Sequence, residues 1–264
     1  MHMANDMERL DKVLSRHGYG SRKDAGRMIA GSLVTVNGET VRNPSLHVNL
    51  AEDRITVDGR DLDIRIHRHL MMNKAAGYVC STKEGEHETV FDLLADEDLH
   101  GYLGGDLAIV GRLDLDTEGL LLFTTDGKLN HFLTSPKNHI PKTYLVHLED
   151  GVDEEKKKEY EQKLRAGIHI EADGNDEACD CMSAEIEWPD KKTDAACECL
   201  LTIYEGKYHE VKRMFSALGN KVVYLKRVAF NSLRLDENLL PGQYRDLTEQ
   251  EVEGLRSIYA NTSF

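Results

Sequence analysis

Two short apolar runs, LAIVGRL and LLLFTTDG, flank an acidic segment between residues 107 and 127. Both runs have the pattern of strands. Between them, Asp114, Asp116 and Glu118 occupy alternate positions and are followed by Gly119. The fold must therefore place three carboxylates in a connection between two strands, which raises the question of what these carboxylates do.

Calcium binding is one explanation for the acidic segment. An EF-hand loop needs a bidentate acid at its twelfth position and a helix on each side. Counted from Asp114, the twelfth residue is Thr125, and Asp126 comes one place late. Because both flanks also have the pattern of strands, the sequence disfavours a calcium loop. A hairpin turn whose acids face water remains the simplest structural explanation.

A catalytic carboxylate is the other explanation. Arg112 and Asp114 are two apart, so they leave the same face of an extended segment just after a buried strand. A carboxylate beside a guanidinium stays ionised at neutral pH and can attack an electrophilic carbon. A glycosidase pair of Asp114 and Asp116 fits less well, since that chemistry needs carboxyl groups about 5 Å or more apart on opposite sides of a bond. One nucleophile fits better than a pair.

Strand-like and helical segments alternate after residue 65. The strand-like segments include KTYLVHLE, CECLLTIYEG and KVVYLKRVAF. The helical ones are TVFDLLADEDLHGYL at residues 89–103, EEKKKEYEQKLRAG at 154–167 and YHEVKRMFSALGN at 208–220. Paired strands with inserted helices predict an α+β domain over residues 65–264, with flanking helices on a mostly antiparallel mixed sheet.

The first 64 residues have the pattern of a separate small domain. ERLDKVLSRHG has apolar residues at helical spacing and ends at Gly18, and SRKDAGRMIAGS opens with Ser21 as a candidate N-cap. LVTVNG and RITVDG predict two short strands that end in turns. Cations on or beside the two helices suit contact with phosphates; they are Arg9, Lys12, Arg16, Arg22, Lys23 and Arg27.

The formal net charge of −14 argues at first sight against a nucleic-acid partner, because phosphate contacts need Lys and Arg. The charge is unevenly distributed, however, since residues 149–198 hold 17 acidic and 7 basic residues. Residues 7–45 hold 7 basic and 4 acidic residues, and residues 203–235 hold 7 and 2. Two basic regions separated by an acidic one are compatible with a polyanion bound on one face, and also with a solvated charge mixture that binds nothing.

Five cysteines, an odd number, predict free thiols rather than a disulfide framework. The pairs Cys179/Cys181 and Cys197/Cys199 invite comparison with zinc sites, but zinc knuckles prefer two intervening residues. With one, both thiols point to the same side of a strand. No apolar run approaches the roughly 18–20 residues that span a bilayer, and the amino terminus lacks a secretory apolar region. We therefore expect a cytoplasmic protein with no membrane partner.

The small first domain resembles a known RNA-binding module. RLDKVLS, SRKDAGRMI and VTVNGETV are similar to the alpha-L module that is also found in a ribosomal small-subunit protein. We assign this module residues 1–64; the resemblance of the chain as a whole runs from about residue 7 to 253. Such modules accompany many RNA-acting proteins, so this half implies binding to structured RNA and says nothing about chemistry.

The larger domain resembles the rRNA pseudouridine synthases. GRLDLDTEGLLLFTTDG, SPKNHIPKTYLV and EGKYHEVKRMFSALGNKVVYLKRV are similar to the three signature regions of that family, in the expected order. NKAAGYVCST, LTSPKNHIPKTYLV and LLPGQYRDLTEQE are most similar to the branch that modifies 16S small-subunit rRNA, which implies uridine 516 as the target. A synthase for 23S large-subunit rRNA and a non-catalytic RNA-binding protein of ribosome assembly are the alternatives.

The resemblance implies an isomerisation in which a uridine base is detached from its ribose, rotated and rejoined through carbon 5. This reaction needs no cofactor, metal or energy source. The implied partner is rRNA, within a partly assembled small ribosomal subunit, and the expected enzyme is a monomer.

The resemblance also implies roles for particular residues. Asp114, the last residue of GRLD, would attack the anomeric carbon or start the formation of a glycal. Tyr144 would pack on the flipped uracil, and Lys212 would pair with Asp114, with its neighbour Arg213 as second choice. Glu210 stands where a glutamine is expected. The remaining implied RNA contacts are Arg112, Lys207, Tyr208, His209 and Arg213, with Arg9, Lys12, Arg22, Lys23 and Arg27 in the small domain.

Overall fold

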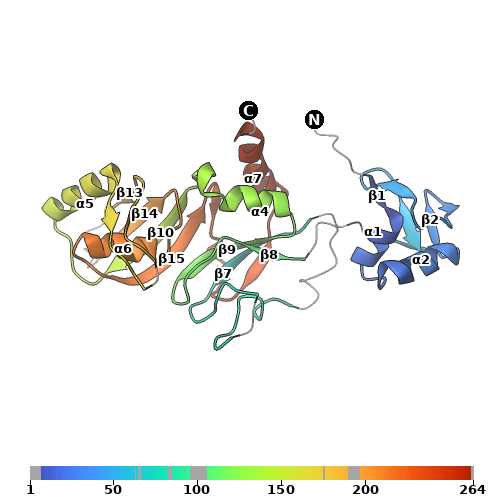
Figure 1. Ribbon diagram of the computed structural model, residues 1–264, viewed down its shortest axis with the longest axis horizontal. Helices are drawn as coiled ribbons and strands as arrows, with labels where there is room; N and C mark the ends of the chain where they lie inside the picture. The colour runs from blue at the N-terminus through green and yellow to red at the C-terminus, as the bar shows by residue number, and fades with distance from the viewer. Residues whose placement is uncertain are drawn as a thin grey trace. The chain divides into compact units, whose positions relative to one another are not determined.

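The chain forms two compact units in a computed structural model that describes residues 7–62, 64, 67–82, 85–95, 106–174, 176–189 and 197–262 (Figure 1). The first unit comprises Met1–Arg68 with Ala95–Ala108 and Thr124–Gly127, and the second comprises the rest. Among the described residues, no helix is both long and apolar enough to cross a membrane.

The amino-terminal unit packs two helices, α1 (Leu10–Arg16) and α2 (Arg22–Ala30), against short strands. Helix α2 begins with a capping box, in which the Ser21 side chain accepts a hydrogen bond from the Asp24 N–H and the Asp24 carboxylate accepts one from the Ser21 N–H. This confirms Ser21 as the N-cap. The apolar faces of both helices meet the sheet in one core of Leu10, Val13, Leu14, Ala25, Ile29, Val34, Val48, Ile55 and Val57.

The strands of this unit are short and joined by tight turns. Asn37–Gly38 and Asp58–Gly59 both have positive φ, which the type I′ turns of two-residue hairpins require. One sheet has the order β3-β2-β5-β6, and a second pairs β1 with β4. Their bounds are β1 Met7–Arg9, β2 Val34–Val36, β3 Glu39–Thr40, β4 His47–Asn49, β5 Ile55–Val57 and β6 Arg60–Asp61.

The second unit is built on a nine-stranded sheet with the central order β13-β14-β10-β15-β9-β7-β17, to which β8 adds on β9 and β16 on β15. The β9–β15 pair is parallel, whereas β13–β14, β14–β10, β10–β15, β15–β16 and β17–β7 are antiparallel. The bounds are β7 His69–Lys74, β8 Ala108–Val110, β9 Glu118–Thr124, β10 Lys142–Leu148, β13 Glu185–Glu187, β14 Glu198–Ile203, β15 Val222–Phe230, β16 Leu233–Arg234 and β17 Tyr244–Asp246. The α+β fold with a mostly antiparallel mixed sheet is thereby confirmed.

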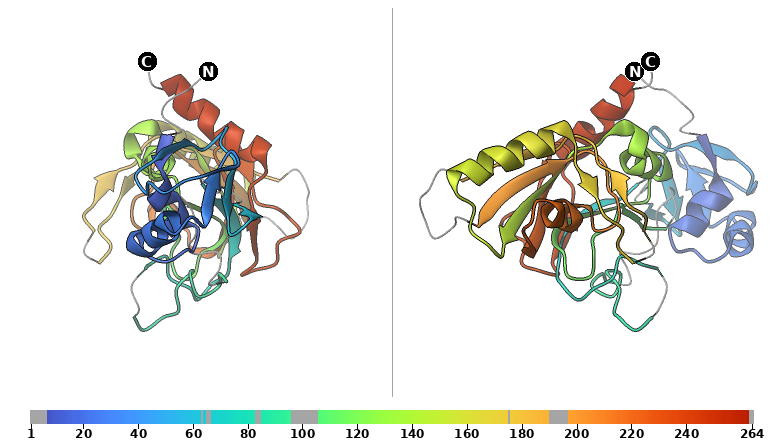
Figure 2. Two further views of the ribbon diagram at one scale, coloured as in Figure 1. Left: turned by 90° about the vertical axis from the view of Figure 1, so that its right-hand side faces the viewer. Right: turned by 60° about the vertical axis from the view of Figure 1, so that its left-hand side comes forward.

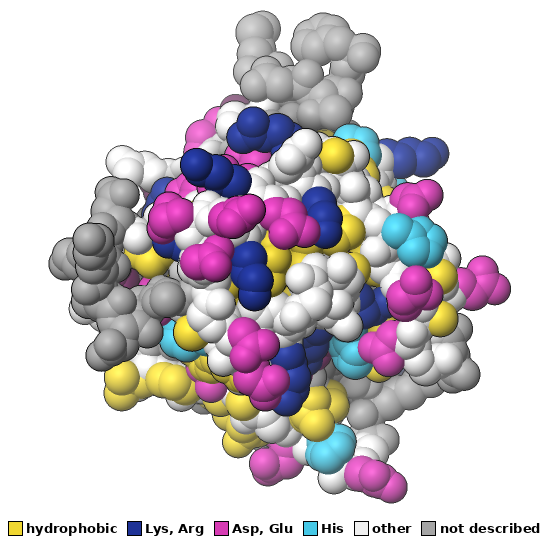
Figure 3. Space-filling model, turned by 90° about the vertical axis from the view of Figure 1, so that its left-hand side faces the viewer, with side chains coloured by type: hydrophobic (Ala, Val, Ile, Leu, Met, Phe, Trp, Pro, Cys, Tyr) yellow, Lys and Arg dark blue, Asp and Glu magenta, His cyan; other side chains and the backbone are white. Residues whose placement is uncertain are grey.

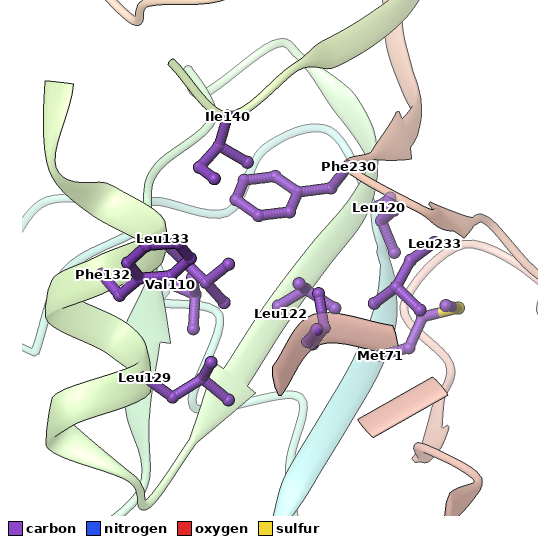
Figure 4. Packing of buried hydrophobic residues seen from close by; sticks show 11 residues of the cluster. Met71, Val110, Leu120, Leu122, Leu129, Phe132, Leu133, Ile140, Phe230 and Leu233 are labelled. Atoms are coloured by element: carbon purple, nitrogen blue, oxygen red, sulfur yellow. The ribbon is translucent and has the colours of Figure 1, made fainter. Parts of the chain in front are cut away.

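Helices flank this sheet at both ends (Figures 1 and 2). At the β13 end, Tyr160 of α5 and Phe215 of α6 bring their ring centroids to 6.2 Å. At the other end, α4 and α7 contribute Leu129, Phe132, Leu133 and Leu255 to a core shared with β7, β9 and β15, and Figure 4 shows the α4 side chains pointing toward Leu122. The bounds are α4 Gly127–Thr134, α5 Glu154–Ala166, α6 Glu210–Ala217 and α7 Glu249–Thr262; the remaining elements are η1 Pro136–Asn138, β11 His169–Ile170 and β12 Cys179–Asp180.

The helix expected at residues 89–103 is absent from the part of that segment that the structure describes. Residues 89–95 form turns instead of the first half of a helix, and residues 96–103 lie outside the described residues. The Thr89 side chain and N–H both donate hydrogen bonds to the Asp92 carboxylate. Local bonding of this kind competes with helical hydrogen bonding, as it does in other turns started by Thr and Asp.

Candidate active site

A cavity of about 850 Å³ opens in the second unit. Its walls come from the segment between β8 and β9, from β10, from the segment between β14 and α6, and from β15. Asp114, Tyr144 and Arg227 line it from three of these elements. The strand register explains part of this meeting, because Tyr144 and Arg227 are cross-strand neighbours on β10 and β15.

Asp114 lies at the rim of the cavity with 30% of its side chain exposed. It belongs to the connection between β8 and β9, which are paired, so the hairpin expected from the sequence is present. The nearest cation is Lys212, whose Nζ is 3.5 Å from Oδ2 of Asp114, and the imidazole Nε2 of His209 lies 4.0 Å from the same oxygen. The carboxylate therefore faces both the cavity and positive charge.

Lys212 makes its closest contacts with Asp116. Its Nζ lies 2.6 Å from Oδ1 and 2.8 Å from Oδ2 of that residue, and the 3.5 Å contact with Asp114 is an ion pair beyond them. Burial disfavours the charge on Asp116, but the hydrogen bonds and charge of Lys212 outweigh it and hold the pKa of Asp116 below its ordinary value. Lys212 thus bridges the two acids of the GRLDLD segment.

A buried lysine, not singled out from the sequence, fixes the backbone that carries Asp114. Lys74, the last residue of β7, is fully buried, and its Nζ donates to the carbonyls of Asp114, Leu115 and Thr117 at 3.1, 3.3 and 2.9 Å. Burial lowers its pKa, although four acidic or thiol neighbours pull in the opposite direction. Hydrogen bonds to several carbonyls stabilise a buried cation and make this turn rigid.

Tyr144 is 7% exposed and lies in the wall of the cavity on β10. Burial raises the pKa of its hydroxyl, while the neighbouring Arg227 opposes the shift. The hydroxyl is therefore neutral at physiological pH, and the ring is available for contact with a flat ligand from inside the cavity.

The segment between β14 and α6 forms another wall of the cavity. Lys207 Nζ donates to Glu205 at 2.6 Å and to the Asp180 carbonyl at 2.8 Å, so its charge is already paired. The Tyr208 and His209 rings stack with centroids 3.8 Å apart, and Tyr208 is among the exposed large side chains. His209 Nδ1 lies 2.8 Å from Oδ2 of Asp173.

Arg213 does not lie where a contact with RNA requires it, and this expectation is corrected. It is buried, and its guanidinium donates to the carbonyls of Glu171, Tyr208 and Glu177. Successive residues of a helix point in different directions, so Lys212 faces the acids while Arg213 anchors loops behind α6. Arg112, by contrast, is exposed and lines the cavity, and its contact with RNA stays a prediction.

The basic residues around the first two helices are mostly engaged with acids of their own unit. Arg9 and Arg22 both donate to Asp11, Lys12 contacts Glu8, and Arg27 lies 3.0 Å from Asp24. Lys23 is exposed. In the second unit, Figure 3 shows acidic and basic side chains interspersed over the face that carries α5 and α6. The basic region at residues 203–235 is thus not a uniformly basic surface on this face.

The four clustered cysteines do not form a metal site with one another within the described part of the chain. The group of possible ligands found there joins Cys181 with Glu205 and Glu210, whose ligand atoms lie within 4.8 Å of one another. Lys207 occupies one Glu205 oxygen, and burial raises the pKa of Cys181 to about 12. A protonated thiol and a lysine in the same place do not suit a cation. All five cysteines are free.

A carboxylate near a lysine and a buried tyrosine line one cavity, and the chain has a separate small helical unit. This arrangement suits an enzyme that works on a base removed from its stack. The family described as RNA pseudouridylate synthase matches residues 68–217, and the S4 domain matches residues 8–59. The chain therefore belongs to the RNA pseudouridine synthase family, with an RNA-binding S4 domain before the synthase domain.

Similar proteins match almost the whole chain. It is 41% identical over 244 residues to the uncharacterized RNA pseudouridine synthase YtzG of Bacillus subtilis, covering 92% of this chain and 96% of that protein. It is 42% identical over 246 residues to ribosomal small subunit pseudouridine synthase A of Escherichia coli, covering 92% and 98%. A crystal structure of a pseudouridylate synthase matches with a TM-score of 0.61 and 37% identity, over 94% of this chain and 99% of the other.

Proposed function

We propose that this protein converts uridine 516 of 16S rRNA to pseudouridine with Asp114 as the nucleophile. The observation that supports this most directly is the position of Asp114, which faces one cavity together with Tyr144 and lies 3.5 Å from Lys212. The cavity of about 850 Å³ has room for a nucleotide that has left its stack.

Four residues in or behind the cavity wall have parts in the proposed reaction. Tyr144 packs against the flipped uracil, and Lys74 holds the turn so that the Asp114 carboxylate needs no reorganisation before it reacts. Asp114 either bonds to C1′ of the ribose or removes a proton from C2′ to give a glycal. Arg112, exposed at the rim, fills the space that the base has vacated or holds a phosphate.

The choice of small-subunit rRNA rests on relatives at 41–42% identity that are named as ribosomal small subunit synthases. We propose a partly assembled small subunit in the cytoplasm as the substrate and a monomer as the active form. The S4 domain would provide part of the affinity through phosphate contacts. Cations such as Arg22, which pairs with Asp11 in the free protein, would exchange that partner for a phosphate of the RNA. A uridine of 23S rRNA is the alternative target.

Tritium release from rRNA labelled at carbon 5 of uracil tests the proposed nucleophile. Asp114→Asn keeps the size of the side chain but removes the negative charge, so we expect release to fall by at least about 10³-fold. Asp150→Asn, at an exposed aspartate after β10, is the matched control and should release tritium at the normal rate.

Two results would contradict the proposal. Release that survives Asp114→Asn would exclude this residue as the nucleophile. If the unmodified protein released no tritium from any rRNA or assembly intermediate, a non-catalytic RNA-binding protein of ribosome assembly would be the better interpretation. Mapping of pseudouridine in rRNA from cells with and without the gene would identify the target.

A further inference from the structure

Two cations lie in the cavity without a carboxylate bonded to either of them among the described residues. Lys142 begins β10 and Arg227 lies on β15, and both line the cavity beside Tyr144. They flank one aromatic ring, with Lys142 Nζ 5.7 Å and Arg227 Cζ 5.2 Å from the centroid of Phe230. Attraction to the ring stabilises the cations only in part, because each contact contributes about 1–2 kcal/mol.

Arg227 is buried with unused hydrogen-bonding capacity. Only 1% of the residue is exposed, and its Nε donates to the Leu120 carbonyl at 2.7 Å. Its guanidinium is also within hydrogen-bonding reach of the Tyr144 hydroxyl, and its Nη2 has no acceptor in the described part of the chain. A buried donor without a partner costs about 1–3 kcal/mol, and more when it is charged. A group of this kind in a cavity wall points to a ligand that supplies the missing acceptor.

The charge of Lys142 is likewise disfavoured by its surroundings. Its Nζ donates to the Ile140 carbonyl at 2.9 Å. Burial and then the charge of Arg227 lower its pKa to about 8, against the opposing pull of Glu210 and Glu205. An anion beside the ammonium group would oppose both causes, because an opposite charge close by favours the protonated form.

The two acids nearest to Lys142 do not neutralise this part of the cavity. Glu205 is paired with Lys207 at 2.6 Å. Burial raises the pKa of Glu210 to about 7, with the charge of Glu205 adding to the shift, so near neutral pH it holds a proton much of the time. Asp114 also faces the cavity but pairs with Lys212 at 3.5 Å, so Lys142 and Arg227 leave an excess of positive charge around Tyr144.

We propose that Lys142 and Arg227 bind and stabilise the detached uracil as its anion, and so act as catalytic residues for departure of the base. The inference rests on the proposed function. Stabilising charge that develops on the leaving group lowers the barrier to breaking the glycosidic bond, and fixed cations in a dry cavity do so most effectively.

The electron count of the reaction requires such an anion. The bond between C1′ and N1 breaks as a carboxylate oxygen of Asp114 bonds to C1′ or takes the C2′ proton, and the electron pair stays on uracil. The charge spreads over N1, O2 and O4, where the N–H donors of Lys142 and Arg227 meet it. When C5 bonds to C1′, this pair forms the new bond and Asp114 gives up C1′ or returns the C2′ proton. The C5 proton then leaves to water, and N1 takes one up.

Leaving-group dependence in single turnovers tests the inference. We would measure loss of the target nucleoside from a 16S rRNA fragment that carries either uridine or 5-fluorouridine, by nuclease digestion and chromatography. With fluorine on C5 there is no C5 proton to release, so the rearranged fluorinated product keeps the fluorine and adds water across N1 and C6, and it is scored as the product for that substrate. Fluorine makes the detached base a weaker base, so it needs less help to leave. Lys142→Met should slow uridine conversion by about 10²-fold and 5-fluorouridine conversion by clearly less, with RNA affinity changed by less than about threefold.

Matched variants separate charge from packing. Lys142→Arg keeps a charge that does not titrate, so most of the rate should return, and the decline of the wild-type rate as pH rises past about 8 should disappear. Arg227→Lys should resemble Lys142→Met. Lys226→Met changes the neighbouring residue, which points to the other face of β15, and should leave both rates unchanged.

The possible outcomes are distinct. Equal slowing of both substrates, no slowing, or a loss explained by RNA affinity would overturn the inference. If Arg227→Lys fails to fold, as judged by thermal unfolding, the two Lys142 variants decide the result. Conversion by the unmodified protein together with an insensitive Lys142→Met overturns the inference alone, whereas no conversion of any rRNA uridine overturns the proposed function and the inference with it.

Discussion

At the scale of single residues, the backbone at position 119 requires glycine. Its φ is +102°, and a Cβ built there would lie 2.3 Å from the carbonyl oxygen and 2.9 Å from the nitrogen of Arg227. Gly119 and Arg227 are register partners in the parallel β9–β15 pair, which joins the two halves of the sheet. The absence of a side chain therefore keeps the strand after Asp114 against the strand that carries Arg227.

Gly119→Ala should be strongly destabilising, because backbone atoms must move apart. We expect the free energy of unfolding in urea to fall by about 3 kcal/mol or more. Gly219→Ala is the matched control, since that glycine has φ +76° with nothing within 4 Å of the added Cβ, and should cost only about 1 kcal/mol. Equal effects of the two substitutions would show that the close contact with Arg227 is unimportant.

Asp114 was recognisable from the sequence because the pattern around it is local: a short apolar strand, an arginine and an acid two residues later. Lys74 was not, because its role depends on carbonyls some 40 residues further along the chain. Nothing in MMNKAAG indicates that this lysine is buried. Lys142 and Arg227 lay inside recognised motifs, but their shared cavity follows from the pairing of β10 with β15.

At the scale of elements, periodicity and caps predicted α1, α2, α5 and α6 and most of the long strands. The helix predicted for residues 89–95 does not form, because Thr89 donates a hydrogen bond to the nearby Asp92 carboxylate instead. The prediction that Arg213 lies on the RNA side is wrong, because a sequence does not show which face of α6 packs inward. Its actual partners, the carbonyls of Glu171 and Glu177, come from a loop some 40 residues earlier.

The segment that leads from β14 into α6 carries a buried acid, Glu210, whose pKa is raised to about 7 beside the charged Glu205. Glu210 is 3% exposed, and its Oε2 accepts the Lys207 N–H at 2.8 Å. Its Oε1 has no donor among the described residues. Burial first, and then the charge of Glu205, raise its pKa from an ordinary 4.5 to about 7. Glu205 keeps its charge against Lys207, with its own pKa lowered despite burial.

This pair predicts how stability depends on pH. Between about 4.5 and about 7 the folded protein holds a proton on Glu210 that the unfolded chain releases, so stability should fall as pH rises through this window. The contribution of Glu205 has the opposite sign but is complete above its unfolded value, so it does not cancel the fall. Glu210→Gln should remove this decline and increase the free energy of unfolding at pH 8 by about 1–3 kcal/mol.

Urea unfolding from pH 4.5 to pH 8 measures this dependence. Glu237→Gln, at an exposed acid, is the control and should keep the wild-type profile. A Glu210→Gln protein that loses stability with the wild-type slope would show that another group binds the proton.

At the scale of the whole molecule, the two units have separate hydrophobic cores. The first core draws all its buried members from residues 10–57, and the core around α4 and β9 draws its members from residues 71–255. Affinity and chemistry can therefore be separated between the units. The acidic stretch at residues 149–198 belongs to the second unit, whereas residues 7–45 of the first unit hold 7 basic and 4 acidic residues. This segment is therefore the better source of long-range attraction to RNA.

A chain of residues 65–264 should fold alone and bind RNA poorly. Because its core is complete, we expect one cooperative thermal transition, with affinity for a 16S rRNA fragment lowered at least about tenfold at moderate salt. The salt dependence of binding should become shallower, since fewer phosphates are contacted, while conversion at saturating RNA stays within about tenfold of the full chain. Residues 1–64 alone should bind the same RNA without converting it.

Two results would contradict this division of labour. A broad, non-cooperative transition of the shortened chain would show that residues near 64 do not mark a boundary between independently folding parts. An unchanged salt dependence of RNA binding would place the main RNA contacts on the synthase domain.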